Sequence, residues 1–144
     1  MKKAYITGAT GAIGMALVGE LLKNRISTTV FLRKDSGRND RVKDSFSGEL
    51  ARGLLRIEYV SLEELSGYAL SRNTQDMKTY ASQDLLTKAA GGADTAVFYH
   101  LGWSGTFGEQ RNDADMQQKN VEYTLDAVRL AKRLGCVHFI GVGS

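Results

Sequence analysis

Short apolar segments alternate along the chain with longer segments whose apolar residues recur every three or four positions. The short segments are rich in β-branched and aromatic residues, which is typical of strands. Strands are therefore expected at Lys3–Thr7, Thr28–Arg33, Leu54–Val60, Thr95–Leu101 and Val137–Val142. The periodic segments predict helices at Ala12–Lys23, within Arg41–Ala51, at Asp84–Ala90 and at Asp113–Leu134. Residues 61–82 have weak periodicity and predict turns with a short helix or an irregular insertion.

Strands that alternate with helices are typical of a parallel sheet joined by right-handed crossovers. The strands are apolar along most of their length, so helices should cover both faces of the sheet. We therefore expect an α/β fold: one domain over residues 1–144, with a doubly wound parallel sheet of strand order 3-2-1-4-5 that ends at the fifth strand. The apolar outer edge of that strand would need a second copy or further chain to cover it.

A turn containing three glycines lies between the first strand and the first helix, in the stretch TGATGAIG. Gly8 would allow a tight turn, Gly11 would let the backbone approach a pyrophosphate, and Gly14 would let the helix pack close to the strand. The helix N-terminus offers unpaired N–H groups that suit a phosphate, and Thr10, Ala12 and Ile13 belong to the same turn. A turn that merely packs well is the alternative. The strand and helix around it favour dinucleotide binding.

Together with this turn, three later segments resemble the extended short-chain dehydrogenase/reductases, the NAD(P)-dependent epimerase/dehydratase group. ADTAVFYHLGW resembles the family's fourth strand, NVEYTLDAVRLAKRLGC its helix beginning Asn-Val-x-x-Thr, and HFIGVGS its fifth strand leading to a catalytic serine or threonine. The resemblance spans nearly the whole chain, although residues 61–82 match poorly. It implies a Rossmann-like NAD(P)-binding domain and hydride transfer on a small substrate, with a nucleotide-sugar as the example that the family suggests.

The same resemblance implies a catalytic tyrosine with a lysine four residues later, which lowers the pKa of the phenol. None of the six tyrosines of this chain has a lysine at that spacing. In the family this pair follows the fifth strand, and Ser144 falls about where the substrate-orienting serine would lie. The chain therefore resembles the first part of an enzyme, and we expect these 144 residues to be inactive alone.

Further cofactor-binding residues are expected mainly where strands end. By resemblance they are Arg33, Lys34, Ser61, His100, Leu101, Gly102 and Asn120. Arg33 and Lys34 stand where a base would bind the 2′-phosphate of NADP, and no acid occupies Arg33's place, so NADP is favoured over NAD; a surface arginine is the alternative. Ser61 replaces an aspartate that commonly touches adenine. His100 and Trp103 follow the fourth strand and could border the cofactor, and for His100 a hydrogen-bonded structural residue is the alternative. Asn120 could hold backbone near the active site or be an ordinary polar residue.

Composition narrows the function classes. The chain is 42% hydrophobic and 24% charged, and no apolar stretch approaches the ~20 residues of a membrane span, so we expect a soluble, cytoplasmic protein. One cysteine and two scattered histidines make no metal site. Residues 33–56, with seven bases and four acids, account for the whole net charge of +3, and a nucleic-acid surface would need a denser basic patch with exposed aromatic residues. The expected partners are a dinucleotide, a small-molecule substrate and a second copy of the chain. The alternative to an enzyme is a non-catalytic NADP-sensing module that acts on a protein.

Overall fold

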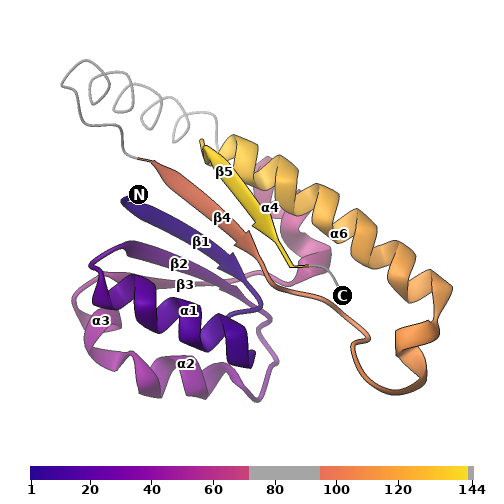
Figure 1. The fold of residues 1–144 in the computed structure, drawn as a ribbon, viewed down its shortest axis with the longest axis horizontal. Helices are drawn as coiled ribbons and strands as arrows, with labels where there is room; N and C mark the ends of the chain where they lie inside the picture. The colour runs from indigo at the N-terminus through magenta and orange to yellow at the C-terminus, as the bar shows by residue number, and fades with distance from the viewer. Residues whose placement is uncertain (72–94, 143–144) are drawn as a thin grey trace.

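The computed structural model describes residues 1–71 and 95–142, and within them the strands form one all-parallel sheet in the order β3-β2-β1-β4-β5 (Figure 1). The strands are β1 (Lys3–Thr7), β2 (Ser27–Leu32), β3 (Leu55–Tyr59), β4 (Ala96–His100) and β5 (His138–Gly141). The α/β class and the order 3-2-1-4-5 are therefore confirmed. The last four strands end one residue earlier than their apolar patterns predict.

The helices follow the predicted pattern with one correction. They are α1 (Ala12–Lys23), α2 (Asn39–Ser45), α3 (Ser47–Ala51), α4 (Leu65–Ser71) and α6 (Ala114–Arg133), with short 3-10 turns η1 (Leu62–Glu64) and η2 (Gly108–Asn112). The prediction of a single helix within residues 41–51 is wrong. The backbone at Phe46 has φ −127° and ψ 32°, which is not helical, so two short helices, α2 and α3, flank this residue. The short helix expected within residues 61–82 is α4. The helix expected at Asp84–Ala90 lies outside the described residues.

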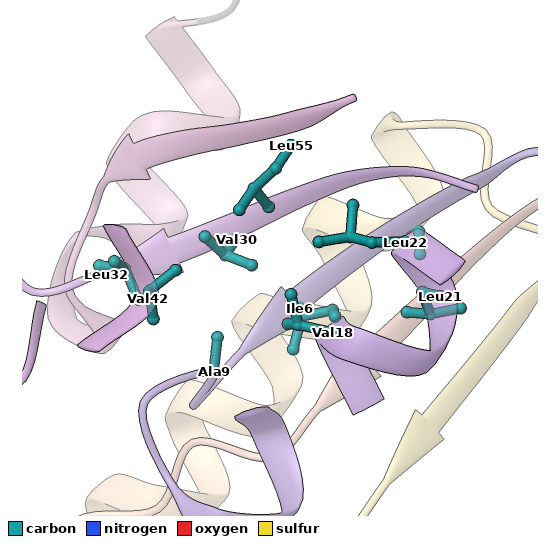
Figure 2. Close-up of a cluster of buried hydrophobic side chains, with 10 residues drawn as sticks. Ile6, Ala9, Val18, Leu21, Leu22, Val30, Leu32, Val42 and Leu55 are labelled. Carbon is teal, nitrogen blue, oxygen red and sulfur yellow. The ribbon is translucent and has the colours of Figure 1, made fainter. Parts of the chain in front are cut away.

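Helices cover both faces of the sheet because strand side chains alternate between the faces. On one face, α1, α2 and α3 pack on a cluster that includes Ile6, Val30 and Leu55 (Figure 2). On the other face, α4 and α6 pack on a cluster that includes the aromatic rings of β1, β2 and β4 (Figure 1). The rings of Tyr5, Phe31, Phe98 and Phe139, from β1, β2, β4 and β5, stack on one another on this face with centroids 5.7–6.4 Å apart.

The order of the strands places the functional edge of the sheet. The chain moves outward in one direction through β2 and β3 and in the other through β4 and β5, so the order reverses at β1. Thr7, the last residue of β1, is in register with Phe31 of β2 and His100 of β4. The segments that leave these three strands therefore meet at one place, and ligands of such sheets bind in the crevice there. Among residues 1–71 and 95–142, no helix is both long and apolar enough to span a membrane.

Candidate functional site

Two of the three glycines in the turn after β1 are required by the fold itself. Gly8 has φ +74°, and a side-chain carbon added there would lie 2.5 Å from the carbonyl carbon of Leu101. A side-chain carbon at Gly14 would collide with the carbonyl oxygen of Gly8 and with the backbone of Ala9. Gly8 thus lets the turn pass close to the segment after β4, and Gly14 lets α1 pack against the turn.

Gly11 differs from these two glycines. Its φ is −75°, which any residue adopts, and an added side-chain carbon would have only the carbonyl oxygen of Gly8 near it, at an ordinary 3.5 Å. Gly11 is the N-cap of α1, provides no side-chain cap, and is followed by no acidic residue in the first turn. The packing of the described residues therefore does not explain the glycine. Space in front of a positive helix end is what an anion would use.

A cavity of about 820 Å³ opens at this point, within the range of small-molecule sites. Four segments line it, each at or after the carboxyl end of a strand, as expected for this edge of a parallel sheet. Its lining residues are Thr7–Ala12 at the end of β1, Phe31–Arg33 and Ser36–Asn39 at the end of β2, Val60–Glu63 after β3, and Leu101–Ser104, Thr106 and Phe107 after β4. The cavity thus brings together Gly8, Thr10, Gly11, Ala12, Arg33, Ser61, Leu101 and Gly102.

The remaining candidates lie elsewhere. Ile13, Gly14, Lys34, His100 and Asn120 do not line the cavity, and Ser144 lies outside the described residues. Ile13 is 66% exposed on α1. The pKa of the Glu64 carboxyl is lowered, mainly by hydrogen bonds from the backbone and hydroxyl of Ser61. The positive charge of Lys34 lowers this pKa to a smaller extent. Roles of these residues in cofactor binding stay predictions.

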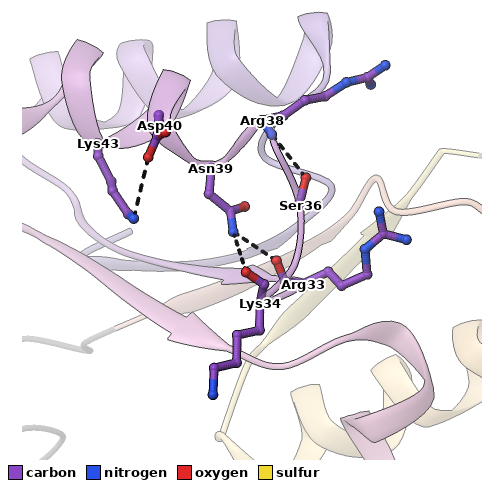
Figure 3. A network of polar contacts seen from close by, with 7 residues as sticks. All are labelled: Arg33, Lys34, Ser36, Arg38, Asn39, Asp40 and Lys43. Atoms are coloured by element: carbon purple, nitrogen blue, oxygen red, sulfur yellow. Dashed lines mark hydrogen bonds and ion pairs between the residues drawn. The ribbon is translucent and has the colours of Figure 1, made fainter.

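Two arginines of the segment between β2 and α2, Arg33 and Arg38, line the cavity, and Figure 3 shows both side chains extending from this segment. Asn39, which is buried, holds this segment: its Nδ2 donates to the carbonyl oxygens of Arg33, at 2.9 Å, and of Lys34, at 3.3 Å. The backbone N–H of Arg38 donates to the hydroxyl of Ser36 at 3.3 Å. Sequence analysis missed Arg38 and Asn39, because the helix was expected to begin at residue 41.

Ser61 begins the wall that follows β3. Its backbone N–H donates to the Glu64 carboxylate at 2.8 Å, and its side chain accepts from the Glu64 backbone, so the two residues form a capping box around η1. This cap fixes the turn that carries Leu62 and Glu63 into the cavity lining. Ser61 therefore stabilises the turn at the cavity wall, and its role in cofactor binding stays a prediction.

Behind the cavity, a chain of hydrogen bonds runs through the buried side chain of His100. The N–H of Gly102 donates to Thr7 Oγ1 at 3.2 Å, and Thr7 Oγ1 lies 2.8 Å from His100 Nδ1. On the other side, His100 Nε2 lies 3.3 Å from Thr124 Oγ1, which donates to the carbonyl oxygen of Asn120 at 2.8 Å. Because the Thr124 hydroxyl proton is used, the consistent tautomer of His100 carries its proton on Nε2 and accepts at Nδ1. Burial lowers the pKa of His100 to about 4, so the ring is neutral at pH 7.

Asn120 holds the backbone of the segment after β4. Its Nδ2 donates to the carbonyl oxygen of Ser104 at 2.8 Å, and its Oδ1 accepts from the N–H of Ser104 at 2.9 Å. Gln117, one turn earlier on α6, accepts from the indole N–H of Trp103 at 3.0 Å. Trp103 and Ser104 are therefore bonded to α6 through Gln117 and Asn120, which do not themselves line the cavity.

A doubly wound sheet with a glycine turn and a cavity at its point of reversal defines a Rossmann-type protein. The model of the NAD dependent epimerase/dehydratase family matches residues 4–144, and the chain belongs to this family. This finding confirms the resemblance read from the glycine turn and the three later segments.

Solved structures share the fold at low sequence identity. The UDP-Glc/GlcNAc 4-epimerase of Campylobacter jejuni is 16% identical, with a TM-score of 0.62 over 98% of this chain and 36% of that one. The yeast methylglyoxal/isovaleraldehyde reductase complexed with NADPH is 13% identical, with a TM-score of 0.53 over 88% of this chain and 32% of that one. A protein of Burkholderia multivorans named as a putative short-chain alcohol dehydrogenase is 16% identical. Its TM-score is 0.55 over 94% of this chain and 56% of that one. This chain thus spans about a third to just over half of each neighbour. No curated protein matches the sequence significantly.

Proposed function

We propose that residues 1–144 are the dinucleotide-binding domain of an NAD(P)-dependent oxidoreductase, with NADP as the preferred cofactor. The observation that carries this proposal is Gly11, whose side-chain position faces open space although the fold does not require a glycine there. A pyrophosphate at the N-terminus of α1 would explain that glycine, since a side chain would occupy the phosphate's place. Membership of the family and the NADPH complex of the yeast reductase support the same cofactor class.

The cavity fits the other parts of such a cofactor. Arg33 and Arg38 lie on its β2–α2 wall and would hold a 2′-phosphate, with Lys34 as a further base near the segment. Ser61 would border the adenine, and Leu101 and Gly102 would form the wall beside the pyrophosphate. His100 and Asn120 would act through the backbone that they hold rather than by touching the cofactor. When bound, the cofactor supplies hydride exchange at its nicotinamide ring.

Hydride transfer in this family also needs a proton donor or acceptor, and residues 1–144 do not contain the tyrosine–lysine pair that would serve. No tyrosine within the 144 residues has a lysine four positions later. We propose that Ser144 would orient the substrate oxygen and that the 144 residues bind cofactor without sustained turnover, because a positioned general acid or base contributes ~10²–10⁴ in rate. Nucleotide-sugars and small carbonyl compounds are the substrate classes that the comparisons suggest. Binding without turnover would equally suit an NADP-sensing module.

The test is a calorimetric titration of NADPH and NADH into wild type, Gly11→Val and Gly67→Val. Gly67 is a matched control, because it lies in α4 outside the cavity with nothing within 4 Å of an added side-chain carbon. Gly11→Val should abolish binding of both dinucleotides while leaving the circular dichroism spectrum unchanged, and Gly67→Val should bind as wild type does. Wild-type-like binding by Gly11→Val would show that the turn is only a packing device.

A further inference from the structure

Two aromatic side chains line the end of the cavity formed by the segment after β4. We call Trp103 and Phe107 the aromatic rim. Phe107 is 83% exposed, more than any other large hydrophobic residue among those described. Single exposed apolar residues are common on protein surfaces. An exposed ring that shares a cavity wall with a tryptophan is instead a candidate contact for an apolar ligand.

The segment that carries the aromatic rim contacts α6 at Trp103, Ser104 and Gly105. Ser104 is bonded through both its N–H and its carbonyl to Asn120, and the indole N–H of Trp103 is bonded to Gln117. Gly105 has φ +67°, and a side-chain carbon there would lie 2.7 Å from Cγ of Met116, so this point of the segment also packs tightly on α6. A ring presented from a fixed backbone loses little freedom when a ligand binds, which favours affinity.

Charge is distributed unequally between the two ends of the cavity. Among the described lining residues, the positively charged ones are Arg33 and Arg38, and both belong to the β2–α2 segment. The described lining residues after β4 carry no charge, and the lining residues from η1 include one charged residue, the acidic Glu63. A second diphosphate at this end would find no positive partner among these residues and one negative neighbour.

We infer that the aromatic rim binds the apolar part of an uncharged substrate, such as a carbonyl compound with an aromatic or branched aliphatic group, and that nucleotide-sugars are excluded. This inference rests on the proposed function, because the β2–α2 end of the cavity must belong to the dinucleotide. Apolar contact with the ring of Phe107 provides the affinity, and the absence of positive charge provides the selection against a diphosphate.

The sequence supplies its own reporter, because Trp103 is the single tryptophan of the chain. The 144-residue chain is first titrated with NADPH by calorimetry. The NADPH-saturated protein is then titrated with 4-phenyl-2-butanone or with UDP-glucose, and quenching of Trp103 fluorescence is followed alongside calorimetry. The variants are Phe107→Ser, Phe107→Tyr as the conservative change, and Leu70→Ser as a matched control that removes a 70% exposed apolar side chain outside the cavity.

The ketone should quench Trp103 saturably, Phe107→Ser should weaken its binding about tenfold, and Phe107→Tyr and Leu70→Ser should stay within about twofold of wild type. NADPH affinity should be the same in all four proteins, and UDP-glucose should not bind. Ketone binding that is insensitive to Phe107→Ser, or saturable binding of UDP-glucose, would overturn the assignment of the substrate class while leaving the cofactor proposal intact. Failure of NADPH to bind wild type would remove both.

Discussion

The two halves of the sheet differ in how many large apolar side chains they leave exposed. In the half formed by β1, β2, β3 and α1–α3, Ile6, Val18 and Val30 are fully buried, while Ile13 and Tyr59 are exposed. In the half formed by β4, β5 and α6, Phe98 and Leu130 are fully buried, but six large apolar side chains remain 42–55% exposed. They are Val121, Leu125 and Val128 on α6, and Val137, Ile140 and Val142 along and beside β5. Similar residue types are used in both halves, so the difference lies in what covers them.

A sequence pattern does not distinguish apolar residues that the fold buries from apolar residues that it leaves exposed, and this contrast does. The strands of the first half are covered on both faces, by α1, α2 and α3 on one and by α4 and α6 on the other. In the second half, β4 and β5 share the face covered by α4 and α6, whereas on the opposite face Tyr99 packs at the border of the first core and Ile140, in register with it, is 45% exposed. Apolar surface of this extent is typical of a contact with further chain or with a second copy, which stays a prediction.

The largest expected difference in stability is between two leucine-to-alanine substitutions, one in α1 and one in α6. Leu22 in α1 is 6% exposed and packs in the first core, whereas Leu125 in α6 is 49% exposed. Leu22→Ala should lower the free energy of unfolding by about 2–5 kcal/mol, through lost burial and the cavity left behind. Leu125→Ala should lower it by less than about 1 kcal/mol. Urea unfolding followed by circular dichroism measures both, and equal losses would show that α6 is covered in solution.

His100 connects the two halves by hydrogen bonds, and its protonation should make the free energy of unfolding depend on pH. It bonds Thr7 of β1 and Thr124 of α6, and its pKa is lowered by burial from 6.5 to about 4. The unfolded chain therefore binds the extra proton first as the pH falls. The stabilisation due to the neutral ring is fully present above pH 6.5 and is lost progressively toward pH 4, by roughly 3 kcal/mol in total.

The measurement is the free energy of unfolding at pH 7, 6 and 5 for wild type and His100→Gln. Wild type should lose stability over this interval, whereas His100→Gln should be less stable at pH 7 and show a flatter dependence. The variant His138→Gln, which removes an exposed histidine of β5, controls for the loss of a histidine as such. Parallel curves for wild type and His100→Gln would contradict a buried neutral ring.

Local chemistry explains which parts of this structure a sequence could predict. The turn at Gly8 and Gly14 was predictable because positive φ and close approach are properties of the glycines themselves, and α1 has the predicted bounds. His100 was left with two alternatives because its partner Thr7 lies 93 residues away. Trp103 was predictable as a residue after the fourth strand that could border the cofactor, whereas Asn39 and Phe107 could not be predicted, since a clamp on two carbonyls and a cavity wall shared with Trp103 exist only once the chain has folded.

The positively charged residues that line the cavity, Arg33 and Arg38, both belong to the first half. Arg33→Ala should weaken NADPH binding about ten- to a hundredfold, because a charge-assisted bond to the 2′-phosphate contributes roughly 1.5–3 kcal/mol. NADH lacks that phosphate and should bind almost unchanged. Arg129→Ala in α6 removes an arginine that pairs with Asp126 outside the cavity, and it should leave both affinities as they are. Calorimetric dissociation constants for both dinucleotides decide the outcome. An equal loss of NADPH and NADH in Arg33→Ala would mean that the residue supports the β2–α2 segment without reading the phosphate, and the preference for NADP would have to come from Arg38.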